Sequence, residues 1–301
     1  MPDTISITVP AKTTTCFVVA TEREPGDARL AMRHRLAEPF AAAVSERLGT
    51  SRLAVTSYPA DGSPWDLAAA TAAEEADTES EARVRKAVHH IGVTALLPVS
   101  DQPFGAQVAR AVARALAGAV AGVVVDLHTA QILPQTPGEK PHFALADDWL
   151  GVSLPPEEGH CSNGDDSING CSCVEFTTRG LRRFGLPELQ MSGVACPHDL
   201  AALNIMRTTA QRLMPIAQLP GQQILSPFLP LASDDLAAFW GVKESLWTDG
   251  PLPVRLTSLG PRLLGVGPPP TFQGTLNEWL WDELPPVMYE LLGCITDPVP
   301  S

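Results

Sequence analysis

The sequence is short of positive charge. Its 301 residues contain 21 Lys and Arg against 34 Asp and Glu, which gives a formal net charge of −13. A nucleic-acid-binding surface needs clustered Lys and Arg to neutralise phosphates, so this balance argues against a nucleic-acid partner. We also expect no membrane partner, because no apolar run approaches the roughly 18–20 residues that a membrane span requires.

Several familiar sequence signals are missing as well. The N-terminus has no basic segment followed by an apolar stretch, so no secretory signal is indicated. There is no P-loop, no Gly-x-Gly-x-x-Gly and no Gly-x-Ser-x-Gly. Six cysteines without a secretory signal indicate a reducing cytoplasm, where clustered cysteines are more often metal ligands than disulfides. With 29 Pro, 23 Gly and a preference for Arg over Lys, the composition is typical of a GC-rich bacterium. We therefore predict a cytoplasmic bacterial protein.

Apolar residues make up 45% of the chain, which is enough to form a core. In the first 135 residues, strand-like and helix-like patterns alternate. Strands are predicted at 14–20, 52–57, 93–99 and 123–127, and helices at 38–48, from Ser80 to Ile91, and at 105–120. Strands separated by helices of this length are typical of βαβ units. We therefore predict an α/β or α+β fold, in which a layered sheet packs against helices.

The pattern changes after Pro134, where Pro, Gly and Trp become frequent. Only three helices are predicted in this part, at 199–213, at 275–292 and from Ser233 onward. The Pro/Gly-rich stretch at 134–141 is a candidate hinge. We therefore divide the chain into an α/β half, 1–135, and a Cys/His-containing half, 136–301, although one continuous domain fits the pattern nearly as well.

The second half contains a group of candidate metal ligands. Cys171 and Cys173 form a Cys-x-Cys pair, Cys196 and His198 form a Cys-x-His pair, and Cys161 is a further candidate. Zinc prefers four tetrahedral ligands, commonly thiolates and imidazoles in two short pairs separated by a loop. We therefore predict a zinc site. Because the spacing differs from the common two-residue knuckle, reduced cysteines in a polar loop or a redox role remain as alternatives.

A site with three or four thiolates is closed and electron-rich, which favours a structural metal. The leading hypothesis is therefore an accessory or binding role, in which zinc fixes the loop at 160–173 against the helix that starts near Asp199. The alternative is a metal-dependent, hydrolase-like enzyme in which Asp126 and His128 line a cleft with the Cys196/His198 region. Asp126 and His128 follow a predicted buried strand, where ligands of α/β proteins often bind. The sequence leaves open whether the protein is an enzyme.

Two other groups of residues could bind a ligand or a protein partner. Arg179, Arg182 and Arg183 could receive an anionic ligand, although a role in surface solubility is the favoured interpretation. Four tryptophans could anchor a protein partner, although tryptophans are more often part of the core. They are Trp240, Trp247, Trp279 and Trp281. Neither group identifies a particular small molecule or protein partner.

Residues 176–189, with the sequence FTTRGLRRFGLPEL, follow a Trp-Leu-Gly-Val segment that starts at Trp149. This arrangement resembles an uncharacterised family of bacterial proteins that share a domain of unknown function. The resemblance covers about residues 10–260, through pattern rather than close identity, and the cysteine group resembles an insertion. It implies an alternating α/β N-terminal half, then a Trp and a Thr-x-Gly-Leu…Phe-Gly-Leu-Pro-Glu core. The family has no established activity, so the resemblance implies no catalytic residues.

Overall fold

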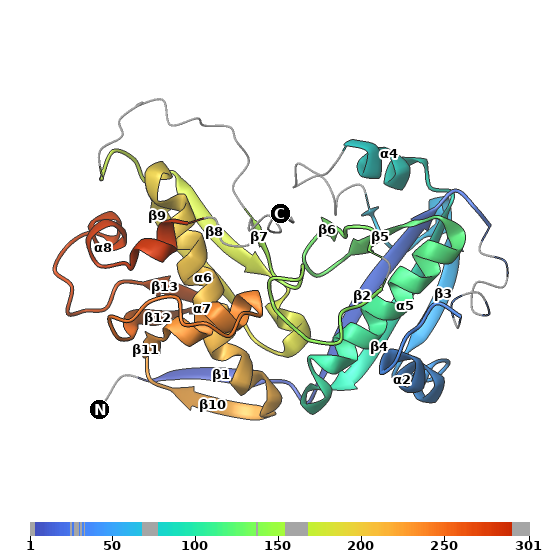
Figure 1. Cartoon of the computed structure of the whole chain (residues 1–301), viewed down its shortest axis with the longest axis horizontal. Coiled ribbons are helices and arrows are strands. Elements are labelled where there is room, and N and C mark those ends of the chain that lie inside the picture. The colour runs from blue at the N-terminus through green and yellow to red at the C-terminus, as the bar shows by residue number, and fades with distance from the viewer. Residues whose placement is uncertain are drawn as a thin grey trace, which may run out of the picture.

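The computed structural model describes residues 4–24, 26, 30, 32, 34–67, 78–136, 138–153 and 168–290. Two large sheets lie side by side, each with its own helices, and a third sheet has two strands (Figure 1). This arrangement confirms the predicted α/β or α+β layered fold.

The first sheet has five strands in the order β3-β4-β2-β5-β6. The strands are β2 (Lys12–Thr21), β3 (Ala54–Pro59), β4 (His89–Pro98), β5 (Val123–Asp126) and β6 (Gln131–Ile132). All neighbouring strands are antiparallel, unlike the parallel neighbours that simple βαβ units produce. Strands β4 and β5 both run opposite to β2, so they are parallel to each other, and α5 (Phe104–Val120) joins them. They form a split βαβ unit, because the central strand β2 lies between them.

The second half of strand β2 is buried on both faces because the residues from Phe17 to Ala20 form an uninterrupted apolar run. Phe17 and Val19 belong to the main core, on the side of α5 and α2 (Phe40–Arg47). Val18 and Ala20 pack on the other side with Val84 of α4 (Thr78–Lys86). Complete burial of one such Val or Phe side chain contributes roughly 1.5–3 kcal/mol. The first sheet is therefore covered by helices on both sides.

The second sheet has six strands in the order β11-β12-β13-β9-β8-β7. The strands are β7 (Gly151–Ser153), β8 (Val174–Arg179), β9 (Glu188–Val194), β11 (Phe228–Leu231), β12 (Leu252–Gly260) and β13 (Leu263–Gly267). Helix α6 (Asp199–Leu213) packs on β8, β9 and β11, and α7 (Ser233–Trp240) packs on α6. The burial of β8 alternates, with Phe176 and Thr178 buried and Glu175 exposed. None of these strands was predicted from the sequence.

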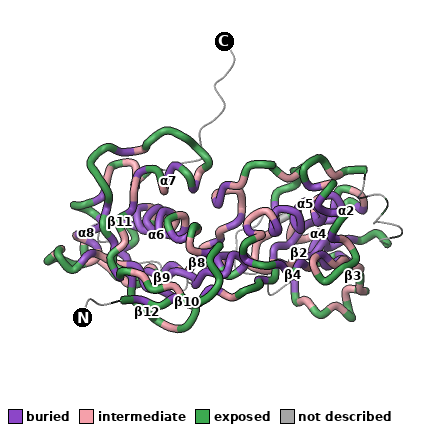
Figure 2. Tube along the Cα trace, turned by 90° about the horizontal axis from the view of Figure 1, so that it is seen from below, coloured by how far each residue is buried: buried purple, intermediate pink, exposed green. Residues whose placement is uncertain are grey.

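The first strand of the chain belongs with the second half. β1 (Ile5–Val9) pairs antiparallel with β10 (Gly221–Leu225), so residues more than 200 positions apart are neighbours. One apolar core includes residues of β1 and of both large sheets, and Figure 2 shows buried segments through both parts of the molecule. The division into 1–135 and 136–301 stays a prediction, and β1 crosses it.

Two helices are shorter than predicted. The helix from Ser80 ends at Lys86, and β4 begins at His89, so His89 and His90 are strand residues. The apolar run that follows them pairs along β2, which outweighs the helical spacing. Helix α8 (Leu276–Asp282) stops well before residue 292, and a 3-10 turn at Pro286–Tyr289 follows. Pro285 and Pro286 lack the backbone N–H that a longer helix would need. None of the described helices is long and apolar enough to cross a membrane.

Candidate metal centre and ligand groove

The candidate ligands lie on a hairpin formed by β8 and β9. The two strands pair antiparallel and are joined through the 3-10 turn Leu181–Phe184. We call this turn the closed end of the hairpin and the Val174/Val194 pair the open end. Cys171 and Cys173 come just before β8, and Cys196 comes just after β9. The strand register therefore brings both cysteine segments to the open end.

Three thiol sulfurs gather at this open end. The Sγ atoms of Cys171, Cys173 and Cys196 all lie within 4.8 Å of one another. The Sγ atoms of Cys171 and Cys196 are 3.5 Å apart, and the backbone N–H of Cys196 donates to Sγ of Cys171 over 3.2 Å. Two thiolates bound to one zinc at about 2.3 Å would lie about 3.8 Å apart in a tetrahedral site. The cluster could therefore hold a metal ion with small adjustments of the side chains.

The charge state of this cluster depends on what it binds. The hydrogen bond with Cys171 raises the pKa of the Cys196 thiol, and burial and the charges of Cys171 and Cys173 add to this effect. Thiolates placed close together repel each other, which favours the protonated form of Cys196. A metal ion reverses this preference, because it deprotonates the thiols that coordinate it.

His198 does not belong to the three-sulfur group. It lies in a 3-10 turn, Cys196–His198, where side chains two positions apart point in different directions. Its imidazole is buried, its Nε2 donates to the carbonyl of Ile168 over 3.2 Å, and its ring lies 5.8 Å from that of Trp281. His198 therefore holds the segment that leads to Cys171. Cys161 lies outside the described residues.

A second contact holds the same segment. Asn169 accepts a hydrogen bond from the hydroxyl of Thr275 over 2.8 Å, and its amide donates to Glu278. Thr275 and Glu278 form the capping box at the start of α8. Residues 168–173 are therefore attached both to the start of α6 and to the start of α8.

Asp126 lies in the interior and does not line a cleft. Both of its carboxylate oxygens accept from Nη2 of Arg183, at 2.7 and 2.6 Å, and both side chains are completely buried. The backbone N–H of His128 also donates to this carboxylate. Within the described residues, Nε and Nη1 of Arg183 have no hydrogen-bond acceptor. The pair joins the end of β5 to the closed end of the hairpin.

His128 lies beside Asp126 and does line a groove, which has a volume of about 610 Å³. The walls come from the end of β5, the closed end of the hairpin and the turn between β12 and β13. Burial and, to a smaller extent, the charges of Arg183 and Arg182 lower the pKa of His128 to about 4, although Asp126 acts in the opposite direction. The imidazole is therefore neutral at pH 7.

The closed end of the hairpin is organised around the buried carboxylate of Glu188. It accepts from the backbone N–H groups of Gly180, Leu181 and Arg182 at 3.1–3.4 Å and from the Thr178 hydroxyl at 2.8 Å. Gly180 has φ +114°, and a Cβ at this position would lie 2.4 Å from the carbonyl oxygen of Trp149. The Thr, Gly and Glu of the sequence motif therefore have a structural role in this turn.

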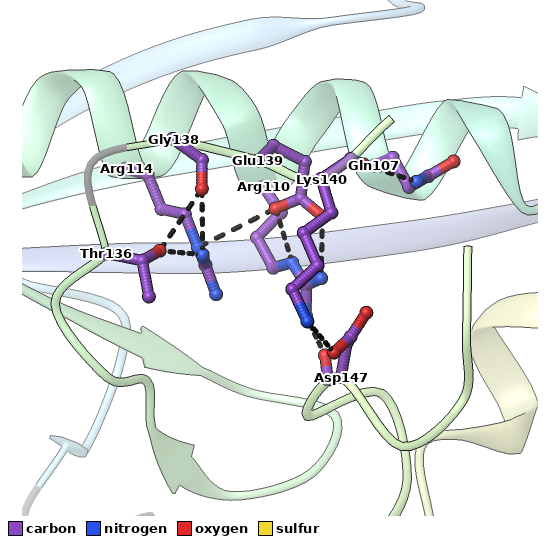
Figure 3. A network of polar contacts seen from close by, with 8 residues as sticks. All are labelled: Gln107, Arg110, Arg114, Thr136, Gly138, Glu139, Lys140 and Asp147. Atoms are coloured by element: carbon purple, nitrogen blue, oxygen red, sulfur yellow. Dashed lines mark hydrogen bonds and ion pairs between the residues drawn. The ribbon is translucent and has the colours of Figure 1, made fainter. Parts of the chain in front are cut away.

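A buried polar network attaches the predicted hinge region to α5 (Figure 3). Arg110 donates to both carboxylate oxygens of Glu139 at 2.7 and 2.6 Å, and also to the carbonyl of Asp147. Its guanidinium lies 3.5 Å from the ring centroid of Trp149. Arg114 donates to Thr136 and to the carbonyl of Gly138. These contacts hold the 136–149 segment against the first sheet.

The four tryptophans have different environments. Trp279 is 1% exposed and Trp247 is 9% exposed, so both belong to the core, and Trp240 is half-buried. Trp281 is 55% exposed. The four side chains therefore do not form a common exposed anchor.

No family model matches the chain, and no curated protein or solved structure matches it significantly. The resemblance to the bacterial domain of unknown function therefore stays a prediction.

Sequence reasoning did not find two residues of the groove. Arg262 is far along the chain from Arg182, and Glu188 was named only as part of the family motif, with no role in a groove. The sequence motif around Gly180 was the signal that pointed to the closed end. Arg262 had no comparable signal.

Proposed function

We propose that the protein binds one zinc ion through Cys171, Cys173 and Cys196, and that this zinc is structural. This proposal rests on the three sulfurs, which lie within 4.8 Å of one another and come from the segments that flank the two strands of one hairpin. Thiolate-rich sites suit zinc, and three thiolates donate enough charge to make the metal a weak Lewis acid. The metal closes the open end of the hairpin and leaves the groove at the other end as the place for a binding or accessory role.

The distance between the two ends argues against one catalytic centre. Strand β8 has six residues, which span about 20 Å at roughly 3.3 Å per residue. The thiols precede this strand, and the groove with His128 lies at its far end. Asp126 is occupied by Arg183 and is therefore not available as a metal ligand. The hydrolase-like alternative, which needs both groups in one cleft, has less support than a structural metal.

Metal analysis of the purified full-length chain tests this proposal. We expect about one zinc per chain after expression with zinc under reducing conditions, and Cys171→Ser and Cys196→Ser should each lose most of it. Cys16→Ser is the matched control, because Cys16 lies in β2 and bonds Thr94, far from the cluster in the chain. A zinc content below about 0.2 per chain, with intact protein, would refute the proposal.

Cobalt replacement tests the ligand set. Cobalt(II) in a tetrahedral thiolate site gives intense visible and near-ultraviolet bands, whose strength rises with the number of sulfurs bound. We expect these bands in the natural chain and in Cys16→Ser, and weaker bands in Cys173→Ser. Cys161→Ser decides whether the sequence-predicted fourth thiolate takes part. A Cys171–Cys196 disulfide in freshly purified protein that contains no metal would instead indicate a redox pair.

A further inference from the structure

The basic cluster that follows β8 divides between two environments. Arg183 is buried against Asp126, whereas Arg179 and Arg182 line the groove beside His128. Arg262, from the turn between β12 and β13, lines the same groove. The fold therefore brings three arginines from two distant segments to the lining of one cavity.

These three arginines have no acidic partner among the residues that the structure describes. Arg179 donates to the Ser153 hydroxyl over 3.2 Å, and none of the three forms an ion pair with a described carboxylate. Glu188 lines the groove, but its oxygens already accept from three backbone N–H groups and the Thr178 hydroxyl. In a chain with a net charge of −13, the groove is a local concentration of positive charge.

The groove also has the size and the apolar surface of a small-molecule site. Its volume of about 610 Å³ lies within the roughly 300–1,000 Å³ of typical ligand pockets. Leu127, Leu259 and Leu263 contribute apolar wall, and Leu259 is 53% exposed. The arginines could bind an anionic group of a ligand, while the leucines could contact an apolar part of the same ligand.

We propose that this groove binds a small organic molecule that carries a phosphate group, with Arg179, Arg182 and Arg262 on the phosphate. A guanidinium presents a planar fork of donors that matches the oxygens of phosphate or carboxylate. A terminal phosphate has three free oxygens for three such forks, whereas a carboxylate has two. The net negative charge of the chain opposes a long polyanion, so a small ligand is favoured over a nucleic acid.

His128 provides an independent reporter of such binding. The groups that set its charge are Arg183, Asp126 and Arg182, and Glu188 lines the same groove. Burial and the two arginines keep the imidazole neutral, with its pKa lowered to about 4. A phosphate dianion in the groove would favour the protonated imidazole, so the pKa of His128 rises on binding.

Calorimetric titration of the full-length chain with inorganic phosphate, pyrophosphate and citrate tests the inference. The titrations are done at low ionic strength, and potassium chloride is the control for the effect of ionic strength. We expect pyrophosphate and phosphate to bind more tightly than citrate. Arg182→Gln and Arg262→Gln should each weaken pyrophosphate binding about ten-fold or more. Arg255→Gln is the matched control, because Arg255 is an exposed arginine of β12 that does not line the groove.

Each outcome of these titrations either supports or overturns the proposed phosphate site. Loss of affinity in both groove variants, together with a raised pKa of His128 by NMR titration, supports the site. Tighter binding of citrate would show a carboxylate site in place of a phosphate site. Absence of binding, or equal weakening by Arg255→Gln, overturns the inference. The inference extends the binding role proposed above but does not depend on the metal, so a chain that keeps its zinc and binds no anion would refute the groove alone.

Discussion

The two ends of the β8–β9 hairpin are held together in different ways. At the closed end, the carboxylate of Glu188 satisfies three backbone N–H groups, and Arg183 connects the turn to Asp126. The acceptors of these hydrogen bonds are buried side chains of the chain itself. At the open end, three thiols meet near the surface, where Cys173 and Cys196 are exposed. The closed end is therefore held by buried groups of the chain, whereas the open end presents three thiols that could hold a metal ion.

The strongest test of the closed end is removal of the Asp126 carboxylate. Asp126→Ala leaves the completely buried guanidinium of Arg183 without its partner. We expect a loss of about 3–5 kcal/mol in the free energy of unfolding, measured by urea denaturation. Asp126→Leu combined with Arg183→Met should recover most of this loss, because the buried charge is removed as well. The exposed Asp61→Ala serves as the control, with an expected change of about 0.5 kcal/mol or less. An equally small effect of Asp126→Ala would show that the pair does not hold the turn.

The next effect is a dependence of stability on pH through His128. Its folded-state pKa is lowered to about 4 from 6.5, so between these values the unfolded chain binds more protons than the folded one. The stabilisation is therefore present above pH 6.5 and is lost as the pH falls to about 4. The expected size is on the order of 3 kcal/mol.

This dependence can be assigned by comparing variants. The difference in unfolding free energy between pH 7 and pH 4 should shrink in His128→Gln and stay unchanged in His34→Gln, which alters an exposed histidine. A profile that His128→Gln leaves unaltered would mean that His128 is not held neutral beside the arginines.

The smallest expected effect concerns the open end alone. Removal of metal by a chelator should accelerate amide hydrogen exchange roughly ten- to hundred-fold at Val174 and Val194, which corresponds to about 1.4–2.7 kcal/mol of local stability. Leu189, whose N–H donates to Thr178 at the closed end, should exchange at its former rate. Faster amide exchange at both ends would show that the two ends of the hairpin are not stabilised independently.

The sequence predicted the elements whose signals are local. Helix α6 was predicted at the observed Asp199–Leu213, and α5 differs from its prediction by one residue at its start. Amphipathic spacing determines such helices without reference to the rest of the chain. The second sheet was missed because apolar and polar residues alternate along β8 and β12, without the continuous apolar run that marks β2 and β5. In β7, only three residues are strand.

The same distinction applies to the candidate sites. The grouping of Cys171, Cys173 and Cys196 could be predicted because closely spaced cysteines are typical of metal sites. His198 was expected with them, but the 3-10 turn directs its imidazole to Ile168. Arg262 reaches the groove only because β13 runs parallel beside β9, where its carbonyl accepts from Glu188. No local pattern encodes a pairing of that kind.

The pairing of β1 with β10 has a consequence for how the protein is made. During synthesis, Ile5–Val9 leaves the ribosome well before its partner Gly221–Leu225, which follows only after some two hundred further residues. A strand that is made early is thus ordered late. A nascent chain must keep this apolar strand from aggregating until the partner arrives, and separate expression of residues 1–135 would leave it with no place to fold.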